Sequence, residues 1–555
     1  MKKIVLTLLF VVASLAMALP VWSQVVSNPN DRIYTDLKLW ADEGLISRLP
    51  PLRPYPIQLV TQYLKEVERA GTAADRKRAA AYLDAIDHRF KGSITPSALV
   101  RVGIGSGGRT HFEQAGLIGT IQGTLTPSVT YSARLGAYAM SNSATPGPLQ
   151  PGQPDTTFSL PLYQRPAQDV INDVSVNELP FIHLTPRLSM DSQTALGSST
   201  AYFEAGLMRD SFGPFWGDSV VLSPTAPQSG NLSFTWREGF FTYTALLLAI
   251  SATNNDGSGG PQPDKYLSLQ SLEFYPTSWL SLGILDSVVW GTNLNPLYML
   301  PVPTVFFYSS GTVGYPGAAH VGLSAGIKLP QSLRADFLLY QGDTSFNDII
   351  RLHFNTMLIF AGQAGLSWTP DMRFLKRLSL GYTVVSPYSY THENASSGLN
   401  YENYTNNGQN MATSLDPNSD RIQIKALVRP LPSTDVTLFG RYIRHANASY
   451  DIPNMPASAN GTVFDDGTNS SGTLTYTPGS GYSQLFRFLT QPVIEKVIQV
   501  GFDAKAYLDT PIGRIDGEIG YTFQYVMNAL DANGNPQSGV NATNSYVTVG
   551  AGISF

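Results

Sequence analysis

Apolar and polar residues alternate with a period of two along most of the chain from residue 98 onward. Within residues 421–429, one set of alternating positions is apolar and the other is polar or charged. The apolar set is Ile422, Ile424, Ala426 and Val428, and the polar set is Arg421, Gln423, Lys425 and Arg429. Because successive side chains of a β-strand point to opposite faces, the pattern predicts strands with one apolar face.

About eighteen such runs follow one another, and the links between them alternate between short and long. The runs begin near residues 98, 116, 128, 181, 199, 231, 240, 264, 278, 317, 332, 356, 376, 421, 433, 494, 512 and 544. The long links are 141–180, 209–230, 253–263, 290–316, 342–355, 390–420, 446–493 and 527–543. A soluble sandwich would also alternate, but tight turns at one end and long loops at the other are typical of an outer-membrane β-barrel.

The segment before these runs has a helical period instead. Apolar residues recur every three or four positions after Asp31, again after Pro56, and a third time from Ala73 to about Phe90, and glycines separate the three stretches. The pattern predicts three short amphipathic helices. We therefore assign residues 24–95 to a small helical bundle and residues 96–555 to the barrel.

The first 23 residues have the layout of a secretory signal peptide. Lys2 and Lys3 precede an apolar run that reaches Leu19, and Pro20 and Ser23 follow. A membrane anchor helix is the alternative, but the run is shorter than the ~20 residues a spanning helix needs. We expect cleavage near Ser23, and export to the outer membrane of a diderm bacterium, with the helical bundle in the periplasm and the long loops outside the cell.

The last run supports the same assignment. Its alternating apolar positions are Val547, Val549, Ala551, Ile553 and the terminal Phe555. A strand that ends in an aromatic residue resembles the signal read by the barrel assembly machinery. We expect this machinery and outer-membrane lipid to be partners of the chain.

Composition narrows the class further. Charged residues make up 14% of the chain, below the ~25% of ordinary soluble domains, and Gly, Tyr and Phe are abundant. The net charge of −5 gives no reason to expect nucleic acid, and the absence of Cys excludes disulfides and thiolate metal sites. Since strands in a bilayer must all find two neighbours, we predict an all-β transmembrane barrel of about 18 antiparallel strands with a small N-terminal α-helical bundle, and a monomer.

The polar face of the strands is rich in charge. The candidate lumen charges are Arg421, Lys425, Arg429, Arg441 and Lys505. They would either attract anionic solutes or acidic sugars, or form cross-strand ion pairs that stiffen a solvated wall.

The long links are rich in aromatic residues next to Asn, Gly and Ser. Examples are Phe212 and Trp216 in one link and Tyr298, Tyr308 and Tyr315 in another. Aromatic planes stack on the C–H faces of sugar rings, so these links suit carbohydrate binding. Alternatively, they belong to the aromatic girdle at the membrane surface.

No feature of the sequence points to catalysis. The seven His are scattered, and none lies in a nucleophile-elbow or zinc-binding motif. No phosphate-binding glycine loop or metal-spaced cluster is present either. We therefore expect no enzyme activity, no cofactor and no metal.

The stretch Gly206–Ser223, with Leu294–Leu297 and the opening Ile33–Leu37, resembles the capsule assembly Wzi family. Phe212 and Phe215 stand where the family pattern has Trp and Gly. The resemblance implies an outer-membrane lectin with a periplasmic helical bundle and an eighteen-stranded barrel. The candidates for polysaccharide binding are Arg209, Phe212, Trp216, Asp218, Tyr298, Tyr308 and Tyr315. The stretch fits a plug inside the barrel mouth as well as a sugar site.

Three hypotheses of function follow. The first is a barrel that binds or anchors capsular or other surface polysaccharide. The second is a porin or diffusion channel for small anionic or sugar solutes. The third is a structural or adhesive surface protein whose helical bundle docks a periplasmic partner.

Overall fold

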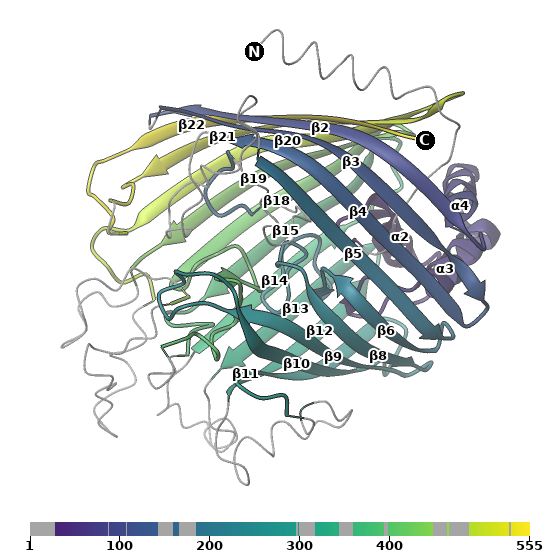
Figure 1. The fold of residues 1–555 in the computed structure, drawn as a ribbon, viewed down its shortest axis with the longest axis horizontal. Helices are drawn as coiled ribbons and strands as arrows, with labels where there is room; N and C mark the ends of the chain where they lie inside the picture. Colours follow the sequence, from purple (N-terminus) through teal and green to yellow (C-terminus); the bar gives the residue numbers. More distant parts are fainter. Residues whose placement is uncertain are drawn as a thin grey trace.

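The computed structural model describes most of the chain after the N-terminal segment (Figure 1). The described residues are 28–86, 88–106, 108–142, 159–165, 185–295, 298, 317–342, 359–392, 398–447, 463–464, 488–531 and 534–555. The expected signal peptide, residues 1–23, lies outside them.

Eighteen strands form one closed antiparallel barrel, which confirms the predicted fold class. Each strand pairs with the next one along the ring, and β22 pairs with β2 to close it. The barrel strands are β2 (Lys91–Gly105), β3 (Gly108–Thr126), β4 (Val129–Asn142), β5 (Thr185–Gly197), β6 (Ala201–Met208), β8 (Ser229–Arg237), β9 (Phe241–Ala252), β10 (Gln262–Phe274), β11 (Leu280–Gly291), β12 (Ala318–Leu329), β13 (Leu333–Gly342), β14 (Ile359–Trp368), β15 (Leu375–Val385), β18 (Ser419–Leu431), β19 (Thr434–His445), β20 (Glu495–Thr510), β21 (Gly513–Met527) and β22 (Ala542–Ser554).

The strand starts agree closely with the alternating runs, except at the first two strands. β2 begins at Lys91, inside the range assigned to the helical bundle, and β3 begins at Gly108. The additional residues do pair, since Lys91 lies opposite Gln122 and Gly105 lies opposite Gly108. Glycines and Pro96 interrupt the apolar alternation there, so the pattern under-predicts both strands.

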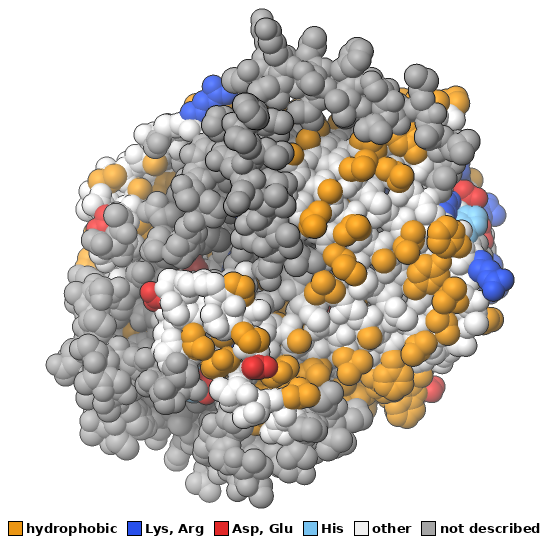
Figure 2. All heavy atoms as spheres, viewed as in Figure 1, with side chains coloured by type: hydrophobic (Ala, Val, Ile, Leu, Met, Phe, Trp, Pro, Cys, Tyr) orange, Lys and Arg blue, Asp and Glu red, His pale blue; other side chains and the backbone are white. Residues whose placement is uncertain are grey.

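The outer face of the barrel is apolar over the described strands. Large hydrophobic side chains project from it and remain exposed, among them Leu117, Leu135, Phe203, Leu232, Ile284, Leu323, Phe337, Leu380, Ile424, Leu438, Val500, Ile519 and Val549. Figure 2 shows hydrophobic side chains spread across the wall that faces the viewer, while charged side chains lie near its rims. Such a wall is stable only against lipid, and closure of the ring leaves no unpaired strand edge in it.

Three helices lie together at one end of the barrel, beside the ends of β2, β3 and β4 (Figure 1). They are α2 (Arg32–Glu43), α3 (Ile57–Ala70) and α4 (Ala73–Ile86). Asp31 caps α2 through the Ile33 N–H, and Gly44 ends it in the left-handed conformation. The prediction that the third helix reaches Phe90 was wrong: α4 ends at Ile86, and Phe90 is exposed. No helix among the described residues is long and apolar enough to cross a membrane.

The helices pack on one another and on the barrel wall. Their buried core includes Leu37, Trp40, Leu64 and Ile86, and Tyr202 of β6 joins it. The Gln122 side chain of β3 donates a hydrogen bond to the Ala85 carbonyl at 3.1 Å. At least one tight turn of the barrel lies at this end. Arg78 of α4 donates a 3.1 Å hydrogen bond to the carbonyl of Pro432, which lies in the turn between β18 and β19. We call this the helical end of the barrel.

Candidate functional site

Residues 209–228, between β6 and β8, do not extend away from the barrel but fold into its lumen, and we call them the inward segment. Within it, β7 (Ser211–Phe212) pairs antiparallel with β1 (Leu52–Arg53) of the helical domain. The Gly213 N–H continues the pairing with a 3.0 Å hydrogen bond to the Pro51 carbonyl. Gly213 has φ +118°, a conformation that favours glycine. The helical domain and the inward segment therefore meet inside the barrel.

Asp218 fixes the inward segment to the wall. Its carboxylate accepts a 2.8 Å hydrogen bond from the Arg421 guanidinium of β18. The Thr413 hydroxyl and the Ser414 N–H also donate to it, at 2.6 and 3.0 Å. In addition, Gln363 of β14 donates to the Asp218 carbonyl at 3.1 Å. The inward segment is thus held from both β14 and β18.

Trp216 lies between cations of the wall. Lys425 donates to the Trp216 carbonyl at 3.2 Å and lies 5.8 Å from the ring centre. Arg377 lies 5.4 Å from the same ring centre. These distances are those of cation–π contacts, so Trp216 anchors the segment as Asp218 does.

An apolar core fills the middle of the lumen. The inward segment contributes Phe212, Val220, Val221 and Leu222, and the described residues 386–392 and 398–418 contribute Tyr390, Tyr404, Met411 and Leu415. The wall contributes inward-facing leucines of β9, β10 and β13, namely Leu246, Leu248, Leu267, Leu269 and Leu338. The Tyr390 hydroxyl donates to the Val220 carbonyl at 2.7 Å. A water-filled channel has a polar interior, whereas this stretch of wall is apolar on both faces.

The predicted lumen charges have partners mainly on the inserted parts of the chain. Arg421 and Lys425 hold the inward segment. Arg429 pairs with Asp36 of α2 at 2.7 Å and with its strand neighbour Asp435 at 2.6 Å. Arg441 donates to the side-chain oxygens of Gln423 and Gln499 at 2.9 and 3.2 Å. Of the two interpretations, ion pairing describes Arg421 and Arg429 better than an open cationic wall does. Their pairs with Asp218 and Asp36 also hold the inserted parts of the chain against the wall.

Lys505 is different, because it lines a cavity. The cavity has a volume of about 490 Å³ and lies between the start of the helical domain and the lumen faces of β2–β4 and β20–β22. Arg134, Arg514, Asp516 and Glu518 line it as well. This side of the lumen is less completely filled than the side that holds the apolar core.

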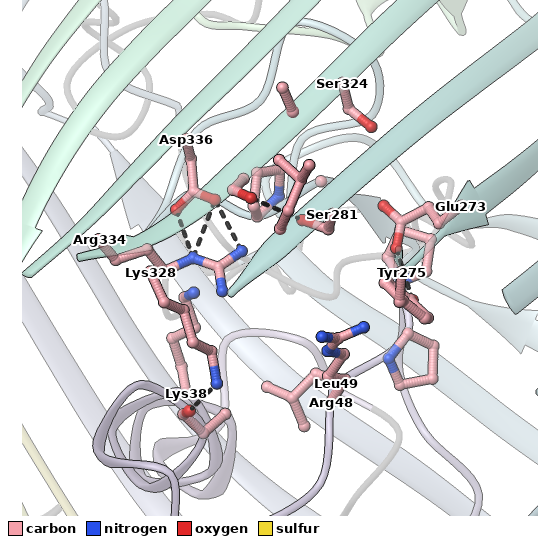
Figure 3. Close-up of a pocket in the computed structure, with 18 of the residues that line it drawn as sticks. Lys38, Arg48, Leu49, Glu273, Tyr275, Ser281, Ser324, Lys328, Arg334 and Asp336 are labelled. Atoms are coloured by element: carbon pink, nitrogen blue, oxygen red, sulfur yellow. Dashed lines mark hydrogen bonds and ion pairs between the residues drawn. The ribbon is translucent and has the colours of Figure 1, made fainter. Parts of the chain in front are cut away.

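A second contact between helix and wall surrounds a small cavity of about 90 Å³ (Figure 3). Figure 3 shows Lys328, Arg334 and Asp336 of the barrel facing Lys38 of α2. Lys328 donates to the Ala41 carbonyl at 3.2 Å, and Arg334 pairs with Asp336 at 2.7 Å. Asp42, one turn after Lys38, pairs with Lys38 at 3.0 Å and with Arg377 at 3.3 Å.

The ion pairs around α2 shift its titrating groups. Burial alone would raise the pKa of the Asp36 carboxyl, but Arg78 and Arg429, together with the Tyr82 hydroxyl, lower it to about 2. Burial and the nearby Arg334 lower the pKa of Lys38 to about 8, against the opposing effect of Asp42. The carboxylates that dock α2 therefore stay ionised at neutral pH.

The remaining candidate residues occupy other surroundings. Arg209 is buried and donates to the Ala226 carbonyl at 2.5 Å, within the inward segment. Tyr298 packs on Trp290, with ring centres 4.7 Å apart, and its carbonyl accepts from Ser268 of β10. Trp290 and Ser268 belong to the face of β10 and β11 that points away from the lumen, and Tyr298 and Trp290 are buried together on that face. Tyr308 and Tyr315 lie outside the described residues.

No pattern in the sequence indicates β1, or the contribution that the described parts of residues 386–418 make to the lumen core. A dipeptide strand flanked by Pro50, Pro51 and Pro54 has no detectable alternation, and its partner lies far away in the chain. Among the residues that the structure describes, no group of three or more His, Cys, Asp or Glu side chains is placed to hold a metal ion.

No family model and no curated protein matches the sequence. Among solved structures, the chain is similar to Wzi of Escherichia coli, an outer-membrane protein involved in group 1 capsule assembly and described as a carbohydrate-binding β-barrel. The two share 12% identity with a TM-score of 0.55, over 96% of this chain and 99% of that chain. OccD3 of Pseudomonas aeruginosa matches at 11% identity and a TM-score of 0.42, over 84% of this chain and 91% of its own. The predicted resemblance to Wzi is thus confirmed at the level of the fold, which is that of an outer-membrane β-barrel.

Proposed function

We propose that this protein is an outer-membrane barrel that binds polysaccharide at the cell surface and does not conduct solutes. The observation that carries the proposal is the pairing of β1 with β7 inside the lumen. It joins the helical domain to the inward segment, and the apolar core around Phe212 and Leu338 surrounds the junction. The junction and the surrounding core would block the lumen at a point where a solute channel needs an open path.

Three features favour a polysaccharide as the ligand. The Wzi barrel, which shares the fold, is described as carbohydrate-binding. The long links of this chain carry many aromatic and amide side chains. The strand ends that flank these links lie at the end of the barrel opposite the helices (Figure 1), so we expect the links on one side of the membrane. Many weak stacking and hydrogen-bond contacts along one polymer would add up to firm retention.

The four candidates of the inward segment act in this proposal as supports rather than as sugar contacts. Arg209 and Phe212 are buried, and Trp216 and Asp218 are engaged by wall residues. Among the described loop aromatics, Tyr401 is better placed for a sugar. Its side chain is half-buried and lies over Gly291 at the end of β11, where any side chain in place of the glycine would collide with it.

The test is binding of purified, detergent-solubilised protein to a glycan array and to the polysaccharide of the native cell. We expect binding to at least one of them, and weaker binding by Tyr401→Ala. Tyr404→Phe serves as the control, since Tyr404 is buried in the lumen core and keeps its ring. Failure of the wild type to bind either source would refute the proposal.

The channel alternative rests on one specific observation, the 490 Å³ cavity beside Lys505. Segment 159–165 lies over this side of the lumen, since the Leu162 N–H donates to Gln524 at 2.9 Å and Gln499 donates to the Leu162 carbonyl at 2.7 Å. These contacts favour a closed chamber over a through-going path.

A further inference from the structure

A row of charged side chains crosses the barrel wall at the end opposite the helices. The strand register sets Asp420 of β18 opposite Arg444 of β19, and Arg444 opposite Lys496 of β20. The three residues lie beside the long links 390–420 and 446–493, at strand ends that are far from the helices (Figure 1). We call them the outer charged row.

The side chains of this row point away from the lumen. Ile422, Leu438 and Ile498 occupy the same alternating positions further along the three strands, and they are between 37% and 49% exposed. By contrast, Ile443 and Val497, which adjoin the row in sequence, are fully buried and belong to the lumen core. Because successive side chains of a strand alternate between its faces, the outer charged row lies on the lipid-facing side of the wall.

The charges within the row do not balance. The Asp420 carboxylate accepts hydrogen bonds from two nitrogens of the Arg444 guanidinium, one of them at 2.9 Å, and another from the Tyr382 hydroxyl of β15 at 3.0 Å. Lys496 stands on the other side of Arg444, and its ammonium has no hydrogen bond or ion pair with the described residues. The row therefore carries two cations and one anion.

The two cations need a further anion near them. Like charges directly opposite each other on neighbouring strands destabilise the pairing. Asp420 lies on the far side of Arg444 from Lys496, and the residue opposite Lys496 on β21 is the uncharged Met527. An anionic group that contacts both Arg444 and Lys496 would remove the repulsion between them.

The neighbouring row of outward residues places the two cations at the level of lipid headgroups. The register aligns Tyr382, Ile422, Tyr442, Ile498 and Tyr525 across β15, β18, β19, β20 and β21. Tyrosines gather where the apolar wall of an outer-membrane barrel meets the aqueous interface. The outer charged row lies one step closer to the long links than these tyrosines, so it faces the headgroups of one leaflet.

We propose that Arg444 and Lys496 bind the phosphate group of a phosphorylated lipid in the leaflet at the loop end of the barrel, which we expect to be the extracellular one. A phosphate is anionic, and its oxygens accept charge-assisted hydrogen bonds from both guanidinium and ammonium groups. The acyl chains of this lipid would lie along the apolar face of β19 and β20. The site is separate from the proposed polysaccharide binding, because it faces the bilayer.

The experiment uses the full-length mature protein in detergent, with diphosphoryl lipid A as the probe. Native mass spectrometry measures lipid bound at increasing lipid concentration, and lipid A freed of its phosphates is the comparison. We expect saturable binding of the phosphorylated lipid and at least about tenfold weaker binding of the other form, because charge-assisted hydrogen bonds are lost. Both probes keep the same sugars, so sugar binding by the long links cannot produce this difference. Equal affinity for the two lipids would overturn the proposal.

Substitutions then assign the binding to the pair. Lys496→Gln should weaken binding of diphosphoryl lipid A at least about tenfold, whereas Lys496→Arg keeps the charge and should retain most of the affinity. Arg109→Gln is the matched control. Arg109 is an exposed cation at the same end of the barrel, but the residue opposite it on β2 is Ile104. Wild-type affinity in Lys496→Gln, or an equal loss in Arg109→Gln, would show that the pair is not the site.

Discussion

Arg421 of β18 and Asp218 of the inward segment form an ion pair of 2.8 Å inside the barrel, between residues that the sequence alone assigns to different roles. Arg421 was a candidate for a cationic lumen wall and Asp218 a candidate for sugar binding. Because the two side chains pair with each other, both help to position the inward segment against the barrel wall.

Breaking this pair should loosen the plug. Arg421→Gln leaves the Asp218 carboxylate without its cation in a largely buried place, which should lower the free energy of unfolding by about 3 kcal/mol. Urea-induced unfolding in lipid vesicles measures the loss. In a double-mutant cycle with Asp218→Asn, the two changes should be coupled by at least about 1 kcal/mol. Additive effects of the two substitutions would show that the pair does not hold the segment.

The β1–β7 junction should depend on Phe212. Its side chain is 1% exposed within the lumen core, and Phe212→Ala should therefore cost about 3–5 kcal/mol of stability. Phe90→Ala is the matched control, since Phe90 is 67% exposed, and it should change stability by less than about 1 kcal/mol. Equal losses in the two variants would contradict the packing described.

Docking of the helices should weaken in acid. The pKa of Asp36 is lowered to about 2 from an ordinary value of 3.8, so its contribution to stability is present above about pH 4 and is lost as the pH falls towards 2. Fluorescence of Trp40, which is buried against Tyr82 in the helical core, reports the change. Asp36→Asn should remove most of the acid-dependent step. An unchanged transition in that variant would assign the effect to other carboxyls.

A charged side chain on the outward face of the strands should destabilise the barrel. Leu438→Arg places a cation on the lipid face of β19 and should destabilise the barrel by about 2–4 kcal/mol if this position lies near the bilayer centre. Thr437→Arg changes the neighbouring residue, which points to the lumen beside Asp503, and should be tolerated much better. Unfolding of both variants in vesicles provides the comparison. If Thr437→Arg destabilised the barrel more than Leu438→Arg does, the assignment of the lipid face and the lumen face of β19 would be wrong.

The strands were predictable because lipid and lumen impose opposite demands on alternating residues, as Ile424 and Lys425 show. Alternation fails where both faces are apolar. Leu246 and Leu248 face the lumen but pack against the inserted segments, and no local pattern distinguishes that core from lipid. Pairs such as Leu52 with Phe212, or Asp36 with Arg429, join residues far apart in the chain. Their partners depend on the closed barrel, so local periodicity cannot identify them.

The most direct test of the central claim is the single-channel conductance of the purified mature protein in planar lipid bilayers. A barrel sealed by the β1–β7 junction and the lumen core should insert and remain closed, with no stable open steps. Deletion of residues 209–228 should convert it to a conducting pore of the same barrel. Stable open steps by the wild type, of the same size as those of the deletion variant, would contradict the account.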